Sequence, residues 1–248
     1  MQGSNTLVFS LIVPSGTKPA KGWPVAIMGH YSNGSKEDIY LFASRLANRG
    51  MATIAINGPG HGANALGTAD FNLTSGETVT ISAGGRGVDA DLNDKSGANE
   101  GFITVGAPYA LIGYRDVIRQ TVANLMQLVR VIQTGMDVDS DGTADLDPAR
   151  LTFLGSSLGG NYGIPFQAVE GAIRASTVLQ ARITSLLNLP GVTRIARLAM
   201  AAPYFKQNKP LRNLPPVIND VARAAEIQRV LDHQSWSAQS ADPVAYAP

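Results

Sequence analysis

Ser157 stands in the run GSSLG at residues 155–159, which directly follows a short apolar run at residues 151–154. Glycines two positions before and after a serine are typical of a tight turn from a strand into a helix, because they leave room for neighbouring backbone. Such a turn exposes the hydroxyl group, and the N–H of Leu158 at the start of the helix can stabilise an oxyanion. The pattern therefore predicts acyl transfer through a covalent serine adduct, with a plain Gly-Ser turn as the alternative.

A serine nucleophile needs a base to accept its proton, and the base needs an acid to orient it. Of the three histidines in the chain, only His233 follows Ser157. His233 is adjacent to Asp232 in a stretch with helical periodicity. Neighbouring residues on a helix point in different directions, so this Asp-His pair is a poor one. His233 is therefore a weak candidate for the base.

Two acidic runs have the spacing of a calcium-binding loop. The first places aspartates at loop positions 1, 3, 5 and 9, namely Asp137, Asp139, Asp141 and Asp145. Pro148 stands where such a loop has its bidentate glutamate, and in the second run, residues 89–100, Asp94 replaces the turn glycine. Closely spaced carboxylates repel unless a cation or water screens them. We predict a structural calcium at the first loop, with a solvated acidic turn as the alternative, and no cofactor for the chemistry itself.

The segments around Ser157 alternate between strand-like and helix-like patterns. Strands are expected at residues 6–14, 24–30, 51–57, 151–157 and 172–181, and helices at 35–50, 114–135 and 159–171. The run at 24–30 is apolar, as in a parallel strand that is covered on both faces, and the run at 51–57 is expected to be the next buried strand. The order predicts an α/β fold with a mostly parallel sheet. In the long helix, Asp116 is expected to cap the start and Gly135 to end it.

Two stretches break this alternation. Residues 63–108 are polar without a sustained period and are expected to form an irregular excursion. From residue 184, prolines divide short apolar pieces, and an amphipathic stretch follows at 217–236. We therefore expect residues 1–183 to form the α/β core and residues 184–248 to form a helical cap.

Composition excludes several classes of protein. A net charge of +1 with 44% hydrophobic residues argues against a disordered chain and against a basic nucleic-acid binder. The absence of cysteine excludes disulfides and thiolate metal sites. No apolar run approaches the roughly 20 residues that span a bilayer, and the first residues show no signal-peptide pattern. A small-molecule or lipid ester is the expected partner, and the sequence does not predict the oligomeric state.

Four motifs follow one another between residues 24 and 160, namely GHYSNGSKED, GPGHG, YRDVIRQTVANLMQLVR and LGSSLGG. With them the chain resembles the α/β-hydrolase superfamily, and within it bacterial extracellular lipases and esterases. The resemblance implies an ester hydrolase with Ser157 as nucleophile and the N–H of Ser32 as second oxyanion donor, although Tyr31 replaces the glycine of the family's loop. It also implies that His30 and His61 brace loops, and that the protein is extracellular or on the cell surface.

In that superfamily the acid and the histidine follow the nucleophile on loops after two further strands. The sequence after residue 181 predicts no such strands, and residues 242–248 resemble the end of a cap. We therefore expect an incomplete triad in a fragment of a serine hydrolase. The open alternatives are a non-catalytic hydrolase-fold module that calcium stabilises, a thioesterase and a peptidase.

Overall fold

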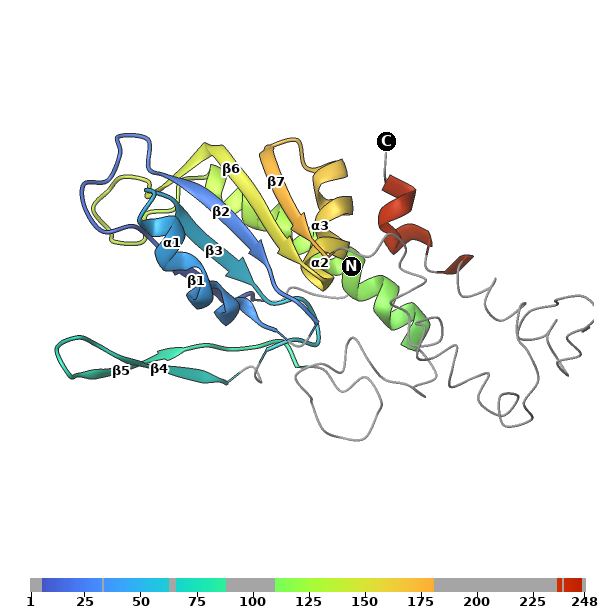
Figure 1. The fold of residues 1–248 in the computed structure, drawn as a ribbon, viewed down its shortest axis with the longest axis horizontal. Coiled ribbons are helices and arrows are strands. Elements are labelled where there is room, and N and C mark those ends of the chain that lie inside the picture. The colour runs from blue at the N-terminus through green and yellow to red at the C-terminus, as the bar shows by residue number, and fades with distance from the viewer. Residues whose placement is uncertain are drawn as a thin grey trace, which may run out of the picture.

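The computed structural model describes residues 6–32, 34–62, 66–87, 110–180, 236–237 and 239–246 (Figure 1). Its centre is a five-stranded sheet with the order β1-β3-β2-β6-β7. The strands are β1 (Phe9–Ile12), β2 (Trp23–Gly29), β3 (Ala52–Ile56), β6 (Leu146–Ser156) and β7 (Ile173–Leu179). β1 runs antiparallel to β3, and the other pairs are parallel. The predicted α/β fold with a mostly parallel sheet is confirmed.

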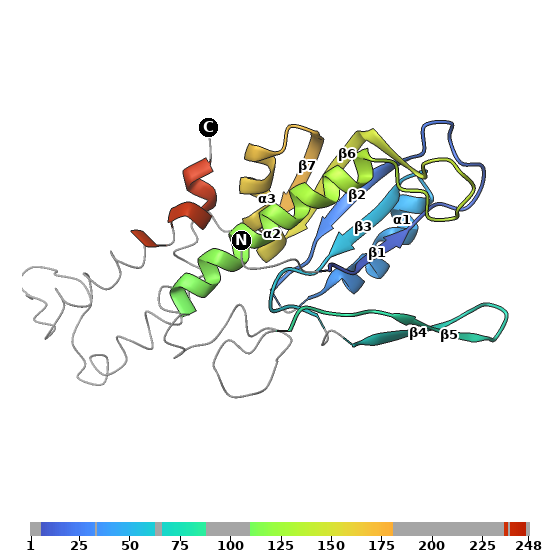
Figure 2. The same cartoon turned by 180° about the vertical axis from the view of Figure 1, so that it is seen from behind.

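Helices lie on both faces of this sheet, which explains why its central strands β2 and β3 are mostly apolar. The helices α2 (Ala110–Gln133) and α3 (Leu158–Val169) lie on the face seen in Figure 2. The 3-10 helix η1 (Lys36–Leu41) and helix α1 (Ala43–Ala47) lie on the other. Every residue of β3 is buried between these two layers. The core therefore surrounds β2, β3 and β6.

The helices differ in detail from the sequence expectation. The segment at 35–50 is divided into η1 and α1, and Ser35 forms a capping box with Asp38 at the start of η1. The expected cap at Asp116 is wrong, because α2 begins at Ala110 and Asp116 instead pairs with Arg115 at 2.8 Å. The long helix ends as expected before Gly135, which has a φ of 92°.

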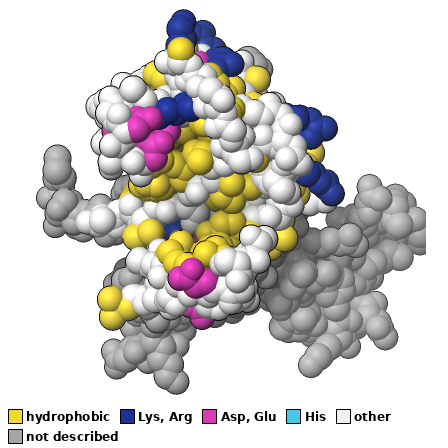
Figure 3. All heavy atoms as spheres, turned by 90° about the vertical axis from the view of Figure 1, so that its left-hand side faces the viewer, with side chains coloured by type: hydrophobic (Ala, Val, Ile, Leu, Met, Phe, Trp, Pro, Cys, Tyr) yellow, Lys and Arg dark blue, Asp and Glu magenta, His cyan; other side chains and the backbone are white. Residues whose placement is uncertain are grey.

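A β-hairpin lies within the stretch that was expected to be irregular. Its strands are β4 (Thr68–Asn72) and β5 (Thr78–Ser82), and they run along one side of the sheet in Figure 1. Alternation puts Phe71 and its neighbours Ala69, Val79 and Ile81 on one face, and Phe71 packs edge-on against Tyr40 with ring centroids 5.3 Å apart. Figure 3 shows hydrophobic side chains gathered in a hollow at this end of the molecule. The expectation of an irregular stretch is therefore wrong for residues 68–82, and residues 88–109 lie outside the described part.

Only the end of the predicted cap is described. The 3-10 turns η3 (Gln239–Ala241) and η4 (Pro243–Tyr246) lie against α2 and α3, and Ala241 is buried in the core. The amphipathic stretch at 217–236, apart from its last residue, lies outside the described residues, so the cap and its boundary stay predictions. Of the helices that the structure describes, none combines the length and hydropathy that a membrane span requires.

Candidate functional site

Ser157 directly follows β6 and precedes the first turn of α3. Its φ of 53° and ψ of −111° are a backbone conformation that residues with a side chain rarely adopt. The N–H of Ser157 donates to the carbonyl of Leu179 at 2.8 Å, and its own carbonyl accepts from the N–H groups of Gly160 and Asn161. The serine side chain makes no capping hydrogen bond to the helix and is partly exposed. The turn therefore presents the hydroxyl at the carboxyl edge of the sheet.

Both glycines around the serine are required by close backbone contacts. A Cβ atom at Gly155 would lie 2.4 Å from the carbonyl oxygen of Gly159. A Cβ atom at Gly159 would lie 2.2 Å from the carbonyl oxygen of Gly29, at the end of β2. These distances are shorter than any normal contact, so only glycine fits at either position. The steric reason inferred from the sequence for the two glycines is confirmed.

The loop after β2 lies beside the serine turn. Gly29 and Gly155 are paired in the parallel register of β2 and β6, so the two strands end side by side. The hydroxyl of Tyr162 on α3 donates to the carbonyl of His30 at 3.3 Å and ties this helix to the loop. Ser32 belongs to that loop, and Leu158 begins the helix. The structure brings these two residues to one edge of the sheet, and their role as oxyanion donors stays a prediction.

His30 is a buried structural residue. Its Nε2 accepts from the N–H of Gly58 at 3.0 Å, so the ring proton is on Nδ1, which donates to the carbonyl of Tyr31 at 2.9 Å. Burial and the neighbouring His61 lower the pKa of His30 to about 3, although the Tyr31 carbonyl favours the charged form. His30 is therefore neutral at physiological pH, and the expectation that it bonds loop backbone is confirmed.

His61 has the same kind of role in the GPGHG loop. Its side chain is fully buried, its ring centroid lies 4.7 Å from that of His30, and its Nδ1 is 2.9 Å from the carbonyl oxygen of Pro59. Burial lowers the pKa of His61, and the backbone groups of Pro59 and Ser32 oppose this shift only in part. Both histidines in the described part of the chain are thus committed to loop structure. His233 lies outside the described residues.

A polar network that the sequence analysis did not identify connects the region of the GPGHG loop, residues 58–62, to the segment after the hairpin. Lys36 is buried, and its Nζ donates to the carbonyls of Ala83 and Gly84 at 3.0 and 3.2 Å. The guanidinium of Arg86 donates to the carbonyl of Asn57 at 3.1 Å. These contacts join residues that are far apart in the chain, and no local pattern signals them. They fix the segment after the hairpin against the loops that flank the serine.

The acidic loop of the sequence analysis lies at the opposite edge of the sheet. The carbonyl of Asp145, just before β6, accepts from the N–H of Trp23 at the start of β2. Asp137, Asp139 and Asp145 each offer one ligand atom within 4.8 Å of the others, and Asp141 is not part of that group. The described residues therefore bring three of the four predicted calcium ligands together. The second acidic run, residues 89–100, lies outside the described residues.

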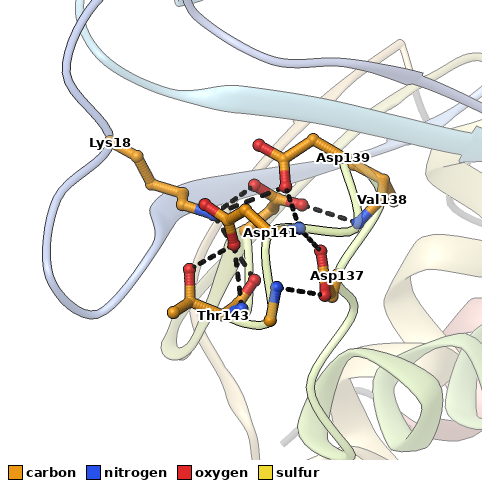
Figure 4. Close-up of polar contacts among 8 residues, drawn as sticks. Lys18, Asp137, Val138, Asp139, Asp141 and Thr143 are labelled. Carbon is orange, nitrogen blue, oxygen red and sulfur yellow. Dashed lines mark hydrogen bonds and ion pairs between the residues drawn. The ribbon is translucent and has the colours of Figure 1, made fainter.

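Lys18 supplies a positive charge to this acidic loop (Figure 4). Its Nζ lies 2.9 Å from a carboxylate oxygen of Asp141, 2.9 Å from one of Asp145 and 3.8 Å from one of Asp139. Hydrogen bonds from Thr143 and then Lys18 lower the pKa of Asp141 to about 2. One ammonium group thus offsets part of the negative charge of this loop. Calcium at this loop stays a prediction, and the ion would have to compete with Lys18.

Comparison with known proteins gives structural matches only. No protein-family model matches the sequence, and no curated protein is detectably similar to it. An acetyl xylan esterase from Paenibacillus sp. R4 matches with 15% identity over 95% of this chain and 60% of its own, at a TM-score of 0.47. A cold-adapted esterase from an Arctic intertidal metagenomic library matches with 17% identity over 68% of this chain and 58% of its own, at 0.38.

A third solved structure, a 2,6-dihydroxy-pseudo-oxynicotine hydrolase, matches with 18% identity over 66% of this chain and 30% of its own, at a TM-score of 0.35. This chain thus spans less than two thirds of the length of each of these three proteins. At these identities and TM-scores, what those enzymes act on carries no argument for this chain. The interpretation of the site rests on its own geometry.

The contact between the serine turn and β2 predicts that two glycine substitutions differ in how much they lower the free energy of unfolding. We expect Gly159→Ala to lower the free energy of unfolding by about 1–3 kcal/mol, because backbone of β2 would have to move. Gly171→Ala is the matched control, since a Cβ atom there has nothing within 4 Å. Urea unfolding monitored by circular dichroism measures both. Equal midpoints for the two variants would contradict the close contact.

The buried histidines predict a loss of stability in acid. The pKa of His30 is lower in the folded chain, so below about pH 6.5 the unfolded chain binds more protons and stability falls. His30 alone then removes about 2 kcal/mol from the free energy of unfolding between about pH 7.5 and pH 5. Urea unfolding at both pH values measures this loss. We expect His30→Gln to reduce it, and an unchanged pH dependence in that variant would show that His30 is not buried and neutral.

Competition between Lys18 and calcium can be measured directly. We expect Lys18→Met to lower Tm in EDTA, because the carboxylates lose their nearest positive charge, and millimolar calcium to restore part of the loss. Lys21→Met removes the same charge from an exposed neighbour and is the control. Differential scanning fluorimetry with and without calcium gives the four values. A calcium response that is the same in both variants would mean that Lys18 does not compete for the loop.

Proposed function

We propose that this chain, whose serine stands on a strand-to-helix turn like that of α/β-hydrolases, hydrolyses carboxylic esters through an acyl-enzyme on Ser157. The observation that carries the proposal is the backbone of Ser157, with a φ of 53° and a ψ of −111°. The two glycine contacts maintain this strained turn at the carboxyl edge of the sheet. A strained turn that exposes a hydroxyl group there is what a serine nucleophile requires.

In the proposed reaction, Oγ of Ser157 attacks the ester carbonyl carbon, and the carbonyl oxygen becomes an oxyanion. The N–H groups of Leu158 and Ser32 donate to this oxyanion. The bond to the alcohol then breaks, and the alcohol leaves with the proton that a base took from the serine. A water molecule repeats the sequence on the acyl-enzyme and releases the acid. The proximity of the loop after β2 to the start of α3 supports this assignment of donors.

The general base is the group that the proposal leaves to experiment. His30 and His61 are bonded to backbone groups, and burial lowers both pKa values. His233, the third histidine of the chain, is the remaining histidine to test. A base supplied from outside the chain is the competing possibility.

Exposed apolar side chains support an apolar part in the substrate, as expected for a small-molecule or lipid ester. Leu179 is 58% exposed at the end of β7, next to Ser157, and Tyr31 is 41% exposed in the loop beside Ser32. Leu179 borders the serine from β7, and Tyr31 lies in the loop that follows β2. The acyl chain length and the alcohol are not specified by these two residues.

A second candidate function is a non-catalytic or incomplete hydrolase-fold module, which calcium binding at the acidic loop would stabilise. The observation that favours it is the commitment of both described histidines to loop structure. Such a module keeps the strained serine turn but gives no turnover. It also gives no reaction of Ser157 with a fluorophosphonate, because that reaction needs an activated hydroxyl.

Hydrolysis of a short p-nitrophenyl ester tests the first proposal. We expect Ser157→Ala to lower kcat by roughly a thousandfold or more, because the covalent step is lost. Ser156→Ala removes the same hydroxyl one residue earlier and should retain most of the activity. Absorbance of released nitrophenolate measures turnover, and mass spectrometry after fluorophosphonate treatment locates the adduct.

The outcomes separate the candidates. Equal activity in the two serine variants would exclude Ser157 as nucleophile. No turnover and no adduct in the native chain would favour the non-catalytic module. Activity that His233→Ala abolishes would identify the base, whereas full activity in that variant would place the base elsewhere.

A further inference from the structure

Gln180 has a strained backbone next to the serine. In the described part of the chain, three residues other than glycine have a left-handed φ: Ser140 at 62°, Ser157 at 53° and Gln180 at 55°. Glycine adopts this conformation without strain, whereas a residue with a side chain does not. Strained residues of this kind persist where the surrounding structure maintains them, and they collect at active sites and ligand clamps. Gln180 therefore requires an explanation, as Ser157 did.

The register of the sheet puts Gln180 beside Ser157. β6 and β7 are parallel, Ser156 is paired with Leu179, and the N–H of Ser157 donates to the carbonyl of Leu179 at 2.8 Å. Ser157 and Gln180 are the residues that directly follow the two strands. Neighbouring strands lie about 4.8 Å apart, so the carboxyl ends of β6 and β7 lie side by side (Figure 1). The side chain of Gln180 is exposed.

Gln180 lies on the side of Ser157 that is opposite to the loop with Ser32, one of the two proposed oxyanion donors. β2, with the loop that contains Ser32, flanks β6 on one side, and β7 flanks it on the other. An ester whose carbonyl oxygen points toward the β2 side directs its remaining groups toward the β7 side. A carboxamide there offers two donors and one acceptor and carries no charge. It suits a hydroxyl group of a neutral substrate.

We propose that Gln180 is a substrate-binding residue whose carboxamide hydrogen-bonds a hydroxyl group of the ester on the β7 side of Ser157. The site then prefers esters that carry a hydroxyl group one or two carbons from the scissile bond. The inference rests on the proposed role of Ser157 as the place where esters bind. It gives the glutamine side chain a role at a position where a glycine would be free of strain, because the bond to the substrate needs the side chain.

Binding to a chain that cannot turn over tests the inference without requiring activity. In a Ser157→Ala background, ligand-observed NMR titration gives the Kd of ethyl propanoate, ethyl lactate and 2-hydroxyethyl propanoate. The last two add a hydroxyl group on the acyl side and on the alcohol side, respectively. We expect one of them to bind roughly three- to tenfold more tightly than ethyl propanoate, as for one net hydrogen bond. Gln180→Gly should remove this preference while Tm stays the same or rises.

Two further variants separate binding from backbone strain. Ser140→Gly relieves the same strain at the acidic loop and should keep the preference for the hydroxylated ester. Gln180→Met keeps a side chain of similar length without the hydrogen-bonding groups, and it should lose the preference even if the glycine variant fails to fold. Equal affinity for all three esters in the Ser157→Ala chain that keeps Gln180 would overturn the inference. A preference that survives in Gln180→Met would overturn it as well. If the native chain shows no turnover but Gln180 still controls the preference for a hydroxylated ester, the inference stands and only the proposed catalysis fails.

Discussion

The candidate site depends on the close approach of the first turn of α3 to the end of β2. Gly159 contacts the carbonyl of Gly29 at a distance that excludes any side chain. This contact aligns the serine turn with the loop after β2, and the hydroxyl of Tyr162 bonds the same loop one helical turn later. Helix propensity does not explain α3, which is rich in glycine and contains Pro165. Burial against β2, β6 and α2 holds the helix and, through it, the serine.

The loops around the serine are held by polar groups that are buried or half-buried. His30 and His61 bond loop backbone as buried rings, and Lys36 and Arg86 bond carbonyls of neighbouring segments. Buried hydrogen bonds of this kind make a loop rigid, because breaking one leaves an unpaired group in a medium of low dielectric. The same burial lowers the histidine pKa values, so these residues support the loop and are poor bases. The base that the proposed function requires has to be sought beyond them.

The two edges of the sheet have separate roles. The carboxyl ends of β2, β6 and β7 bring together the loop with Ser32, the serine turn and Gln180. The amino ends of β2 and β6 carry the acidic loop, where Lys18 lies among the carboxylates. β6 separates the two places along its length, so a cation at the acidic loop would lie away from the proposed reaction site.

The sequence by itself determined the strands, the long helix and the position of the serine turn, because each depends on neighbours within a few residues. Apolar runs, helical spacing and the two glycines around Ser157 are local signals of that kind. It did not predict the hairpin at residues 68–82, whose alternation is short and lies within a polar stretch. It could not show that Lys18 reaches the acidic loop, that Arg86 bonds Asn57, or that Gln180 is strained beside Ser157. Only the tertiary structure decided these, because such contacts depend on strand order and register, which join residues far apart in the chain.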